Sequence, residues 1–208
     1  MKRYVLLGDL VDSRRVPERA KFGAALNRIL TQLNAGWGDV LHAPFSRLKG
    51  VDEIGAVMSS FKSGYRLVRT LEEALYPRRM RVAVSYGDVD VEPGGKAVAA
   101  MDGPAFHLAS AELTGLKSSA YLFSLRSGHP SDALASALFN QLLLPTYRWT
   151  PRQRKIVRTY RELSRQQAVA KKLRISQQAV SQALRSVDWS AFKESETRLE
   201  TFLAEALT

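Results

Sequence analysis

The sequence has no cysteine among its 208 residues, which excludes disulfides, cysteine-based zinc fingers and thiol nucleophiles. Long apolar runs are missing too, because none approaches the roughly 18 residues that a transmembrane helix needs. Near the start of the chain, Asp9 comes too soon to leave room for the apolar core of a signal peptide. We therefore expect a cytoplasmic protein that makes no membrane contact.

Acidic side chains are nearly absent from one segment. Residues 148–187 contain eleven Lys and Arg but a single acid, Glu162. The rest of the chain contains 20 basic and 19 acidic residues, so almost all of the formal net charge of +11 lies in this segment. A compact basic segment beside a nearly neutral body indicates a surface dedicated to phosphate groups.

Hydrophobic spacing upstream of this segment predicts the order strand, helix, hairpin, helix, strand, helix, strand. The expected segments are a strand at 4–7, a helix from Pro17 to 36, strands at 40–48 and 54–58, a helix at 61–75, a strand at 80–91, a helix at 102–113 and a strand at 121–125. This order contains the βαββαβ unit of ferredoxin-like and palm domains, a sheet with helices on one face.

The predicted fold class is α+β: a ferredoxin-like or palm-type sheet domain followed by a small all-α domain. We expect the sheet domain at residues 1–126, a bridging helix at 127–147 and a DNA-binding domain at 148–208.

Three short helices are predicted in the basic segment. Thr150 followed by Pro151 is typical of a helix start, and Ser164 and Ser176 are expected to cap the next two helices. Small Ala170 allows two crossing helices to approach closely.

Residues 167–185 resemble the helix-turn-helix of bacterial repressors and of sigma-factor and response-regulator DNA-binding domains. That geometry places the third helix in the major groove of double-stranded DNA. Its exposed face is expected to read bases through Gln177, Gln178, Ser181, Gln182 and Arg185. Phosphate contacts are expected from Arg165, Lys171, Lys172, Arg174 and Ser176. Arg174 stands where such motifs usually carry a left-handed glycine, which costs roughly 1 kcal/mol.

A C-terminal helix capped by Ser190 carries an apolar stripe. This stripe either packs on its own domain or forms the seam of a homodimer, the usual state of helix-turn-helix proteins. A homodimer is therefore expected.

Two carboxylates follow strand ends in the predicted sheet. Asp9 ends the first strand, and Asp52 lies beside Glu53 in the hairpin. In a palm-like sheet these places are adjacent, so Asp9 and Asp52 could hold Mg²⁺ together with substrate phosphates. Acids at strand ends are also common as solvated turn residues, and spacing alone leaves both interpretations open.

Three segments resemble the signature segments of the SatD family, over roughly residues 1–125. They are Gly8-Asp9-Leu10-Val11-Asp12-Ser13-Arg14, Gly50-Val51-Asp52-Glu53-Ile54-Gly55 and Asp102-Gly103-Pro104-Ala105-Phe106. The same segments are more distantly similar to class III and GGDEF nucleotidyl cyclases. That resemblance implies Asp9 and Asp52 as metal ligands for a bound nucleotide, with nucleotide contacts from Gly50, Glu53, Asp102 and Gly103.

Two departures from the cyclase pattern favour a degenerate domain. Val51 replaces a hairpin glycine, and residues 107–112 lack the asparagine and arginine that stabilise charge on the reacting phosphate. The first hypothesis is a sequence-specific transcriptional regulator whose N-terminal domain binds a nucleotide, senses a ligand or dimerises. The alternative is a Mg²⁺-dependent nucleotidyl cyclase or transferase brought to DNA by its basic segment. A lesser option is a DNA-binding protein without sequence preference.

Overall fold

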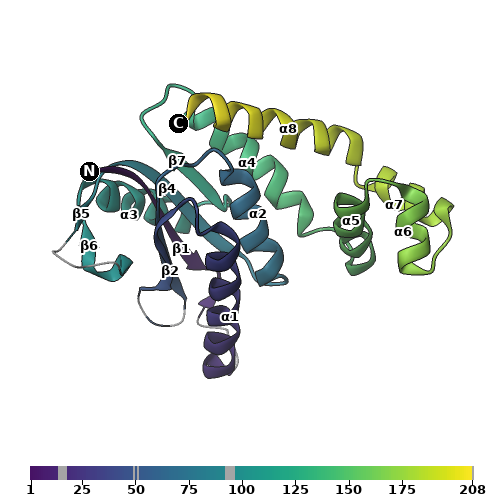
Figure 1. The fold of residues 1–208 in the computed structure, drawn as a ribbon, viewed down its shortest axis with the longest axis horizontal. Coiled ribbons are helices and arrows are strands. Elements are labelled where there is room, and N and C mark those ends of the chain that lie inside the picture. The colour runs from purple at the N-terminus through teal and green to yellow at the C-terminus, as the bar shows by residue number, and fades with distance from the viewer. Residues whose placement is uncertain (14–17, 49, 51, 92–96, 208) are drawn as a thin grey trace. The chain divides into compact units, whose positions relative to one another are not determined.

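The computed structural model describes residues 1–13, 18–48, 50, 52–91 and 97–207 (Figure 1). The chain divides into two compact units. The first unit comprises Met1–Asn140 and Leu199–Thr208, and the second comprises Gln141–Arg198. Pro17 and Val51 lie outside the described residues.

A five-stranded sheet forms the centre of the first unit, in the order β2-β3-β1-β4-β7. Neighbouring strands are antiparallel except β4 and β7, which are parallel. The strands are β1 (Lys2–Leu10), β2 (Leu41–Arg47), β3 (Glu53–Met58), β4 (Met80–Asp88) and β7 (Phe123–Arg126). A separate pair joins β5 (Asp90–Val91) to β6 (Met101–Asp102).

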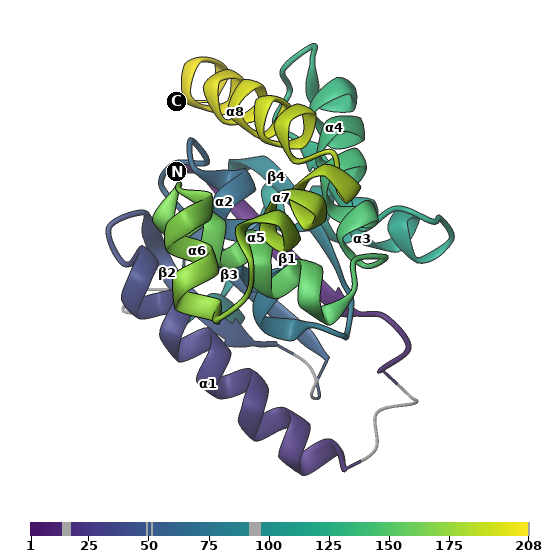
Figure 2. The same cartoon turned by 90° about the vertical axis from the view of Figure 1, so that its right-hand side faces the viewer.

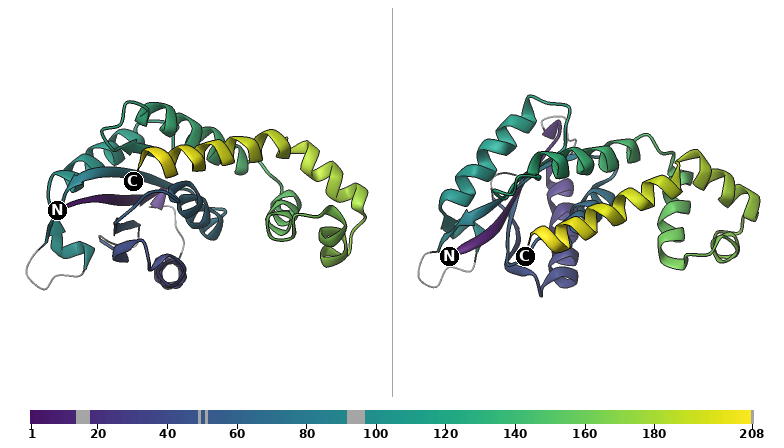
Figure 3. Two further views of the ribbon diagram at one scale, coloured as in Figure 1. Left: turned by 45° about the horizontal axis from the view of Figure 1, so that its top comes forward. Right: turned by 90° about the horizontal axis from the view of Figure 1, so that it is seen from above.

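Helices cover both faces of this sheet (Figure 3). They are α1 (Arg19–Trp37), α2 (Gly64–Leu75) and α3 (Pro104–Lys117), with a short 3-10 helix η2 at Val98–Ala100. Val5 and Leu7 of β1 pack with α3, whereas the ring of Tyr4 stacks on Phe61 on the opposite side. The α+β class is confirmed, but the expectation of helices on one face was wrong. The run Tyr4–Leu7 is buried throughout, as in a strand covered on both faces.

Helix α4 (Asp132–Thr146) was expected to bridge two domains, yet its first part completes the core of the first unit. The ring of Phe139 stacks on Phe123 at 3.7 Å. The side-chain oxygen of Asn140 accepts hydrogen bonds from the backbone N–H groups of Leu122 and Phe123. Residues 127–140 are therefore part of the sheet domain, because α4 supplies both an aromatic core residue and polar partners for β7.

The second unit contains α5 (Pro151–Leu163), α6 (Gln166–Leu173), α7 (Gln177–Ser186) and the first part of α8 (Trp189–Ala206) (Figure 2). Their shared core consists of seven buried residues: Ile156, Val157, Val169, Ala170, Val180, Leu184 and Val187. The three short helices expected in the basic segment are present.

Two of the four predicted helix caps are confirmed. Thr150 forms a capping box with Gln153, and the hydroxyl of Ser176 accepts a hydrogen bond from the backbone N–H of Ala179. Ser164 instead ends α5 in the left-handed conformation, with φ 57° and ψ 3°, and α6 follows Arg165 without a side-chain cap. Ser190 lies inside α8, because that helix already begins at Trp189.

The end of α8 belongs to the first unit, not to the predicted domain 148–208. Phe202 contacts the ring of His129, and Leu203 and Leu207 are buried. Phe192 and Leu199 are buried as well, so most of the apolar stripe is already covered within the described chain. Among the described residues, no helix combines the length and hydropathy needed to cross a membrane.

Candidate functional site

Helix α7 is held in the second unit by one apolar side. Val180 and Leu184 enter the core shared with Ile156 of α5 and Val169 of α6. The amide nitrogen Nε2 of Gln153 donates a hydrogen bond of 2.8 Å to Oγ of Ser186, which ties the start of α5 to the end of α7. The rotation of α7 about its own axis is therefore fixed at both ends.

The opposite side of α7 is exposed and polar. Gln177, Gln178, Gln182 and Arg185 are exposed, and Ser181 is half-buried at the margin. Positions 178, 182 and 185 are spaced by four and three residues, so their side chains share one helix face. Two amides and one guanidinium thus lie together on one face of α7, and Gln177 is exposed at its first turn.

The turn between α6 and α7 contains Arg174 in the left-handed conformation, with φ 54° and ψ 49°. The backbone N–H of Ile175 donates to the carbonyl of Ala170 at 3.0 Å, which closes the end of α6. The Arg174 side chain is exposed. The position that favours glycine is therefore occupied by a cation that projects into solvent.

The five residues predicted to bind phosphate differ in their surroundings. Arg165, Lys171 and Arg174 are exposed, whereas the hydroxyl of Ser176 caps α7. Lys172 forms an ion pair with Glu162, with 2.7 Å between Nζ and Oε2. The hydrogen bond from Lys172 and its charge, together with Arg158, lower the pKa of the Glu162 carboxyl. Part of the charge of Lys172 is thus already neutralised.

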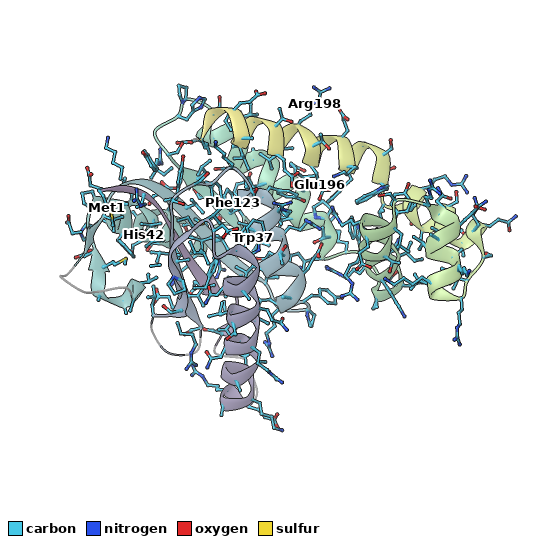
Figure 4. All side chains as sticks on the ribbon, viewed as in Figure 1. Met1, Trp37, His42, Phe123, Glu196 and Arg198 are labelled. Atoms are coloured by element: carbon cyan, nitrogen blue, oxygen red, sulfur yellow. The ribbon has the colours of Figure 1, made fainter. Side chains whose placement is uncertain are left out.

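A buried ion pair joins α5 to α8. Arg161 contacts both carboxylate oxygens of Glu196, at 2.6 and 2.7 Å, and its guanidinium lies 4.7 Å from the ring centroid of Trp189. Figure 4 shows Glu196 and Arg198 on opposite sides of α8. Sequence reasoning missed this pair, although a glutamate within the apolar stripe of α8 was a signal of a buried cationic partner.

The second candidate region lies at the end of β1 in the first unit. Asp9 of β1 is paired in register with Glu53 of β3 and with Arg81 of β4, so the three side chains share one face of the sheet. Oδ2 of Asp9 is 3.6 Å from Nη1 of Arg81, and Oδ1 is 3.2 Å from Nζ of Lys117 at the end of α3. Each oxygen of this carboxylate therefore faces a cation.

Asp52 and Gly50 lie at the same sheet edge as Asp9. The carbonyl of Asp52 accepts a hydrogen bond of 3.0 Å from the backbone N–H of Leu10. Gly50 has φ +59°, and a Cβ there would lie 3.0 Å from Oδ1 of Asp52. The structure thus brings Asp9, Asp52, Glu53 and Gly50 to one edge.

Asp102 and Gly103 lie at the other end of the sheet. Asp102 pairs with Asp90, just beyond Asp88, which is opposite Lys2 at the start of β1. Lys2 and Asp9 are seven residues apart along β1, which corresponds to roughly 23 Å at about 3.3 Å per residue. Gly103 has φ +120°, and a Cβ there would approach the carbonyl oxygen of Asp88 to 2.9 Å. The backbone conformation at position 103 therefore requires glycine. The residues predicted to contact a nucleotide lie in two places, with Gly50 and Glu53 at one end of the sheet and Asp102 and Gly103 at the other.

The surroundings of Asp9 are those of an ion-paired carboxylate. In the part of the chain that the structure describes, no three His, Asp or Glu side chains are grouped so that they could hold a metal ion. Magnesium prefers oxygen ligands in octahedral geometry, whereas the Asp9 oxygens face Arg81 and Lys117. The arrangement instead fastens the end of α3 to the sheet, because Nε of Arg81 also donates to the carbonyl of Leu116 at 3.2 Å.

Comparison with known families identifies the first unit. The model of the SatD family matches residues 4–121, which is more than half of the chain. The chain belongs to the SatD family. The SatD match ends before β7 and includes none of the helices α5–α8.

Solved structures add a distant likeness. Two structures of bacterial light-regulated adenylyl cyclases match 60% of this chain at 16% sequence identity, with TM-scores of 0.42 and 0.44. The matches cover 74% and 43% of those chains. No curated protein matches the sequence.

Within the first unit, sequence reasoning missed the cations that surround its acids. Arg81 and Lys117 are distant from Asp9 in sequence, and Arg126 of β7 reaches Glu112 of α3 at 2.6 Å. The alternation of β4 was a signal for Arg81, since a charged side chain at the end of a buried strand needs a partner. Lys117 and Arg126 carried no such local signal.

Proposed function

We propose that this SatD-family protein binds double-stranded DNA with sequence preference and regulates transcription, with α7 as the recognition helix of a helix-turn-helix. One observation carries the proposal: Gln178, Gln182 and Arg185 are exposed on the side of α7 opposite its buried residues Val180 and Leu184. A helix face that is merely solvated does not require rigidly held amide and guanidinium side chains. It also does not require a surrounding segment that is almost free of acids.

The side chains on α7 have the chemistry that base recognition requires. A glutamine amide can bridge N6 and N7 of adenine, and an arginine guanidinium can bridge O6 and N7 of guanine. An α-helix with its side chains is about 10–12 Å across, and the major groove is about 12 Å wide, so a helix such as α7 can lie in it. With the polar face of α7 in the groove, its apolar side would stay packed in the core shared with α5 and α6.

The surrounding cations favour contact with phosphates on both sides of that groove. Arg165 precedes α6, and Arg174 lies between α6 and α7, where its side chain is exposed. Phosphate contacts fix the position of a protein on DNA without reading sequence, and each one adds salt dependence. Lys172 is expected to contribute less because Glu162 competes for its charge.

For the first unit we propose a regulatory role, by binding of a nucleotide or of a second copy of the chain. Catalysis of nucleotidyl transfer is not favoured, because the oxygens of Asp9 face Arg81 and Lys117. A homodimer would place two recognition helices on two half-sites, and its interface would lie outside the buried stripe of α8.

The test is selection of duplexes from a random-sequence library by the full chain, followed by measurement of dissociation constants for the enriched duplex. We expect Gln178→Ala with Arg185→Ala to weaken binding at least about 30-fold, since each bidentate base contact contributes about 1–3 kcal/mol. The matched control is Arg28→Ala with Gln32→Ala, the same residue types exposed on α1; its affinity should stay within about twofold.

Two results would contradict the proposal. If the library yields no enriched sequence while binding remains steeply salt-dependent, the protein binds DNA without base recognition. If an enriched sequence is bound equally well by the α7 variant, the bases are read by another element.

A further inference from the structure

A second group of exposed cations lies on α5, apart from the residues assigned to base and phosphate contacts above. Arg152, Lys155 and Arg158 are exposed, and Arg148 is exposed just before the helix. No acidic residue occurs in the sequence between Asp132 and Glu162. A solvated helix face usually mixes both signs of charge, so this run of one sign calls for a physical explanation.

Two other arginines on α5 already have structural partners. Arg154 donates to the carbonyl of Thr146, and Arg161 is paired with buried Glu196. Among the described residues, by contrast, no carboxylate lies within ion-pair distance of Lys155 or Arg158; the ion pairs formed by α5 are those of Arg161 and Glu162. Lys155 therefore forms no internal contact of this kind, and the charge of Arg158 acts on the Glu162 carboxylate without forming an ion pair with it.

Lys155 and Arg158 of α5 point away from the recognition face of α7. Ile156 and Val157 turn into the core that α5 shares with α7. At 100° per residue, Lys155 and Arg158 each lie roughly 150° around α5 from the mean direction of those two side chains. Gln182 and Arg185 lie on the side of α7 opposite the same core. Because the core separates the two faces, a straight duplex seated on α7 does not reach Lys155 and Arg158.

We propose that the outer face of α5 is a second DNA-binding surface, which holds the phosphate backbone of a second duplex while α7 reads the first. This inference rests on the proposed function of α7. From Lys155 to Arg158 the helix rises roughly 4.5 Å, a length over which a duplex presents two to three phosphate charges at about one per 1.7 Å. The surface contains no amide side chains directed at bases, so it binds without sequence preference and bridges DNA segments.

The experiment is a sandwich capture with the full chain. The selected duplex is fixed to beads, and a fluorescent duplex of unrelated sequence is captured from solution. We expect Lys155→Gln with Arg158→Gln to reduce captured fluorescence at least about fivefold, while affinity for the selected duplex alone stays within about threefold. The control with the same loss of charge is Lys62→Gln with Lys193→Gln, two exposed lysines elsewhere, which should capture normally.

Each other outcome overturns the inference. Absence of capture by the wild-type protein shows that there is no second surface. Capture that the α5 variant retains assigns bridging to two copies of α7 in a dimer. A parallel loss of single-duplex affinity places α5 on the same duplex as α7. Failure of the wild-type protein to bind the selected duplex is a separate result, because it contradicts the proposed function itself.

Discussion

Arg161 and Glu196 form a bidentate ion pair inside the second unit, with N–O distances of 2.6 and 2.7 Å. The Glu196 side chain is only 2% exposed, and that of Arg161 is 15% exposed. The pair connects α5, which packs against α7, to α8. A buried carboxylate requires this partner, because an unpaired buried charge is strongly destabilising.

Replacing Glu196 with Gln should therefore lower the free energy of unfolding of the second unit by about 3 kcal/mol, since it leaves the buried guanidinium without a counter-charge. Urea denaturation followed by tryptophan fluorescence measures the change. Glu194→Gln provides the control, because Glu194 forms an exposed pair with Arg198 on the same helix; its cost should be below about 0.5 kcal/mol. Equal losses in the two variants would show that burial of the Arg161 pair has no special role.

Replacing Arg174 with Gly should stabilise the second unit by about 1 kcal/mol, since glycine adopts the left-handed conformation without strain. The same change should reduce the salt dependence of DNA binding by about one phosphate contact. Ser164→Gly relieves another left-handed position of this unit, at φ 57°, without removing a cation. Thermal unfolding and titrations at several salt concentrations test both; a salt slope that falls equally in the two variants would contradict a phosphate contact by Arg174.

Glu112 should make the stability of the first unit depend on pH in the acidic range. Burial raises the pKa of its carboxyl, but hydrogen bonds from Ser124 and Arg126 and the charge of Arg126 outweigh that effect and lower it. Because the folded pKa lies below the unfolded one, the stabilisation is present above the unfolded value and is lost as the pH falls through the folded value. Denaturation midpoints between about pH 6 and 3 should fall less steeply for Glu112→Gln than for the wild type. If the midpoints of the two proteins fall equally with pH, Glu112 does not contribute to the pH dependence of stability.

Asp9→Asn should destabilise the first unit by about 1 kcal/mol, because Arg81 and Lys117 lose their counter-charge. Addition of millimolar Mg²⁺ should leave the unfolding temperature of the wild-type protein unchanged. A rise in that temperature for the wild type, absent in Asp9→Asn, would show that magnesium displaces the two cations and that Asp9 is a metal ligand.

Features set by a few neighbouring residues could be predicted from the sequence. Thr150 and Ser176 cap their helices because each is followed by helix-forming residues that offer an unpaired N–H. Arg174 adopts the predicted left-handed conformation because the turn geometry leaves no alternative. Ser164 failed as a cap because α5 continues to Leu163 and uses the serine to end, not to begin, a helix.

Features that depend on distant contacts could not be predicted. The apolar spacing of α4 is compatible with a bridging helix, and only the stacking of Phe139 on Phe123 places it in the sheet domain. Likewise, Asp9 and Asp102 belong to the first and third signature segments of one family pattern, but the antiparallel register separates them along the sheet. The contacts of Asp9 with Arg81 and Lys117 follow from that same register and the length of α3.

The central claim is that α7 reads bases in the major groove, and methylation interference tests it most directly. Methylation of guanine at N7 removes the acceptor that an arginine uses in that groove. The account predicts that methylation of a particular guanine in the selected duplex prevents binding by the wild-type protein, while Arg185→Ala binds more weakly and becomes indifferent to methylation at that base. An interference pattern identical in the two proteins, or no interference at any guanine, would contradict it.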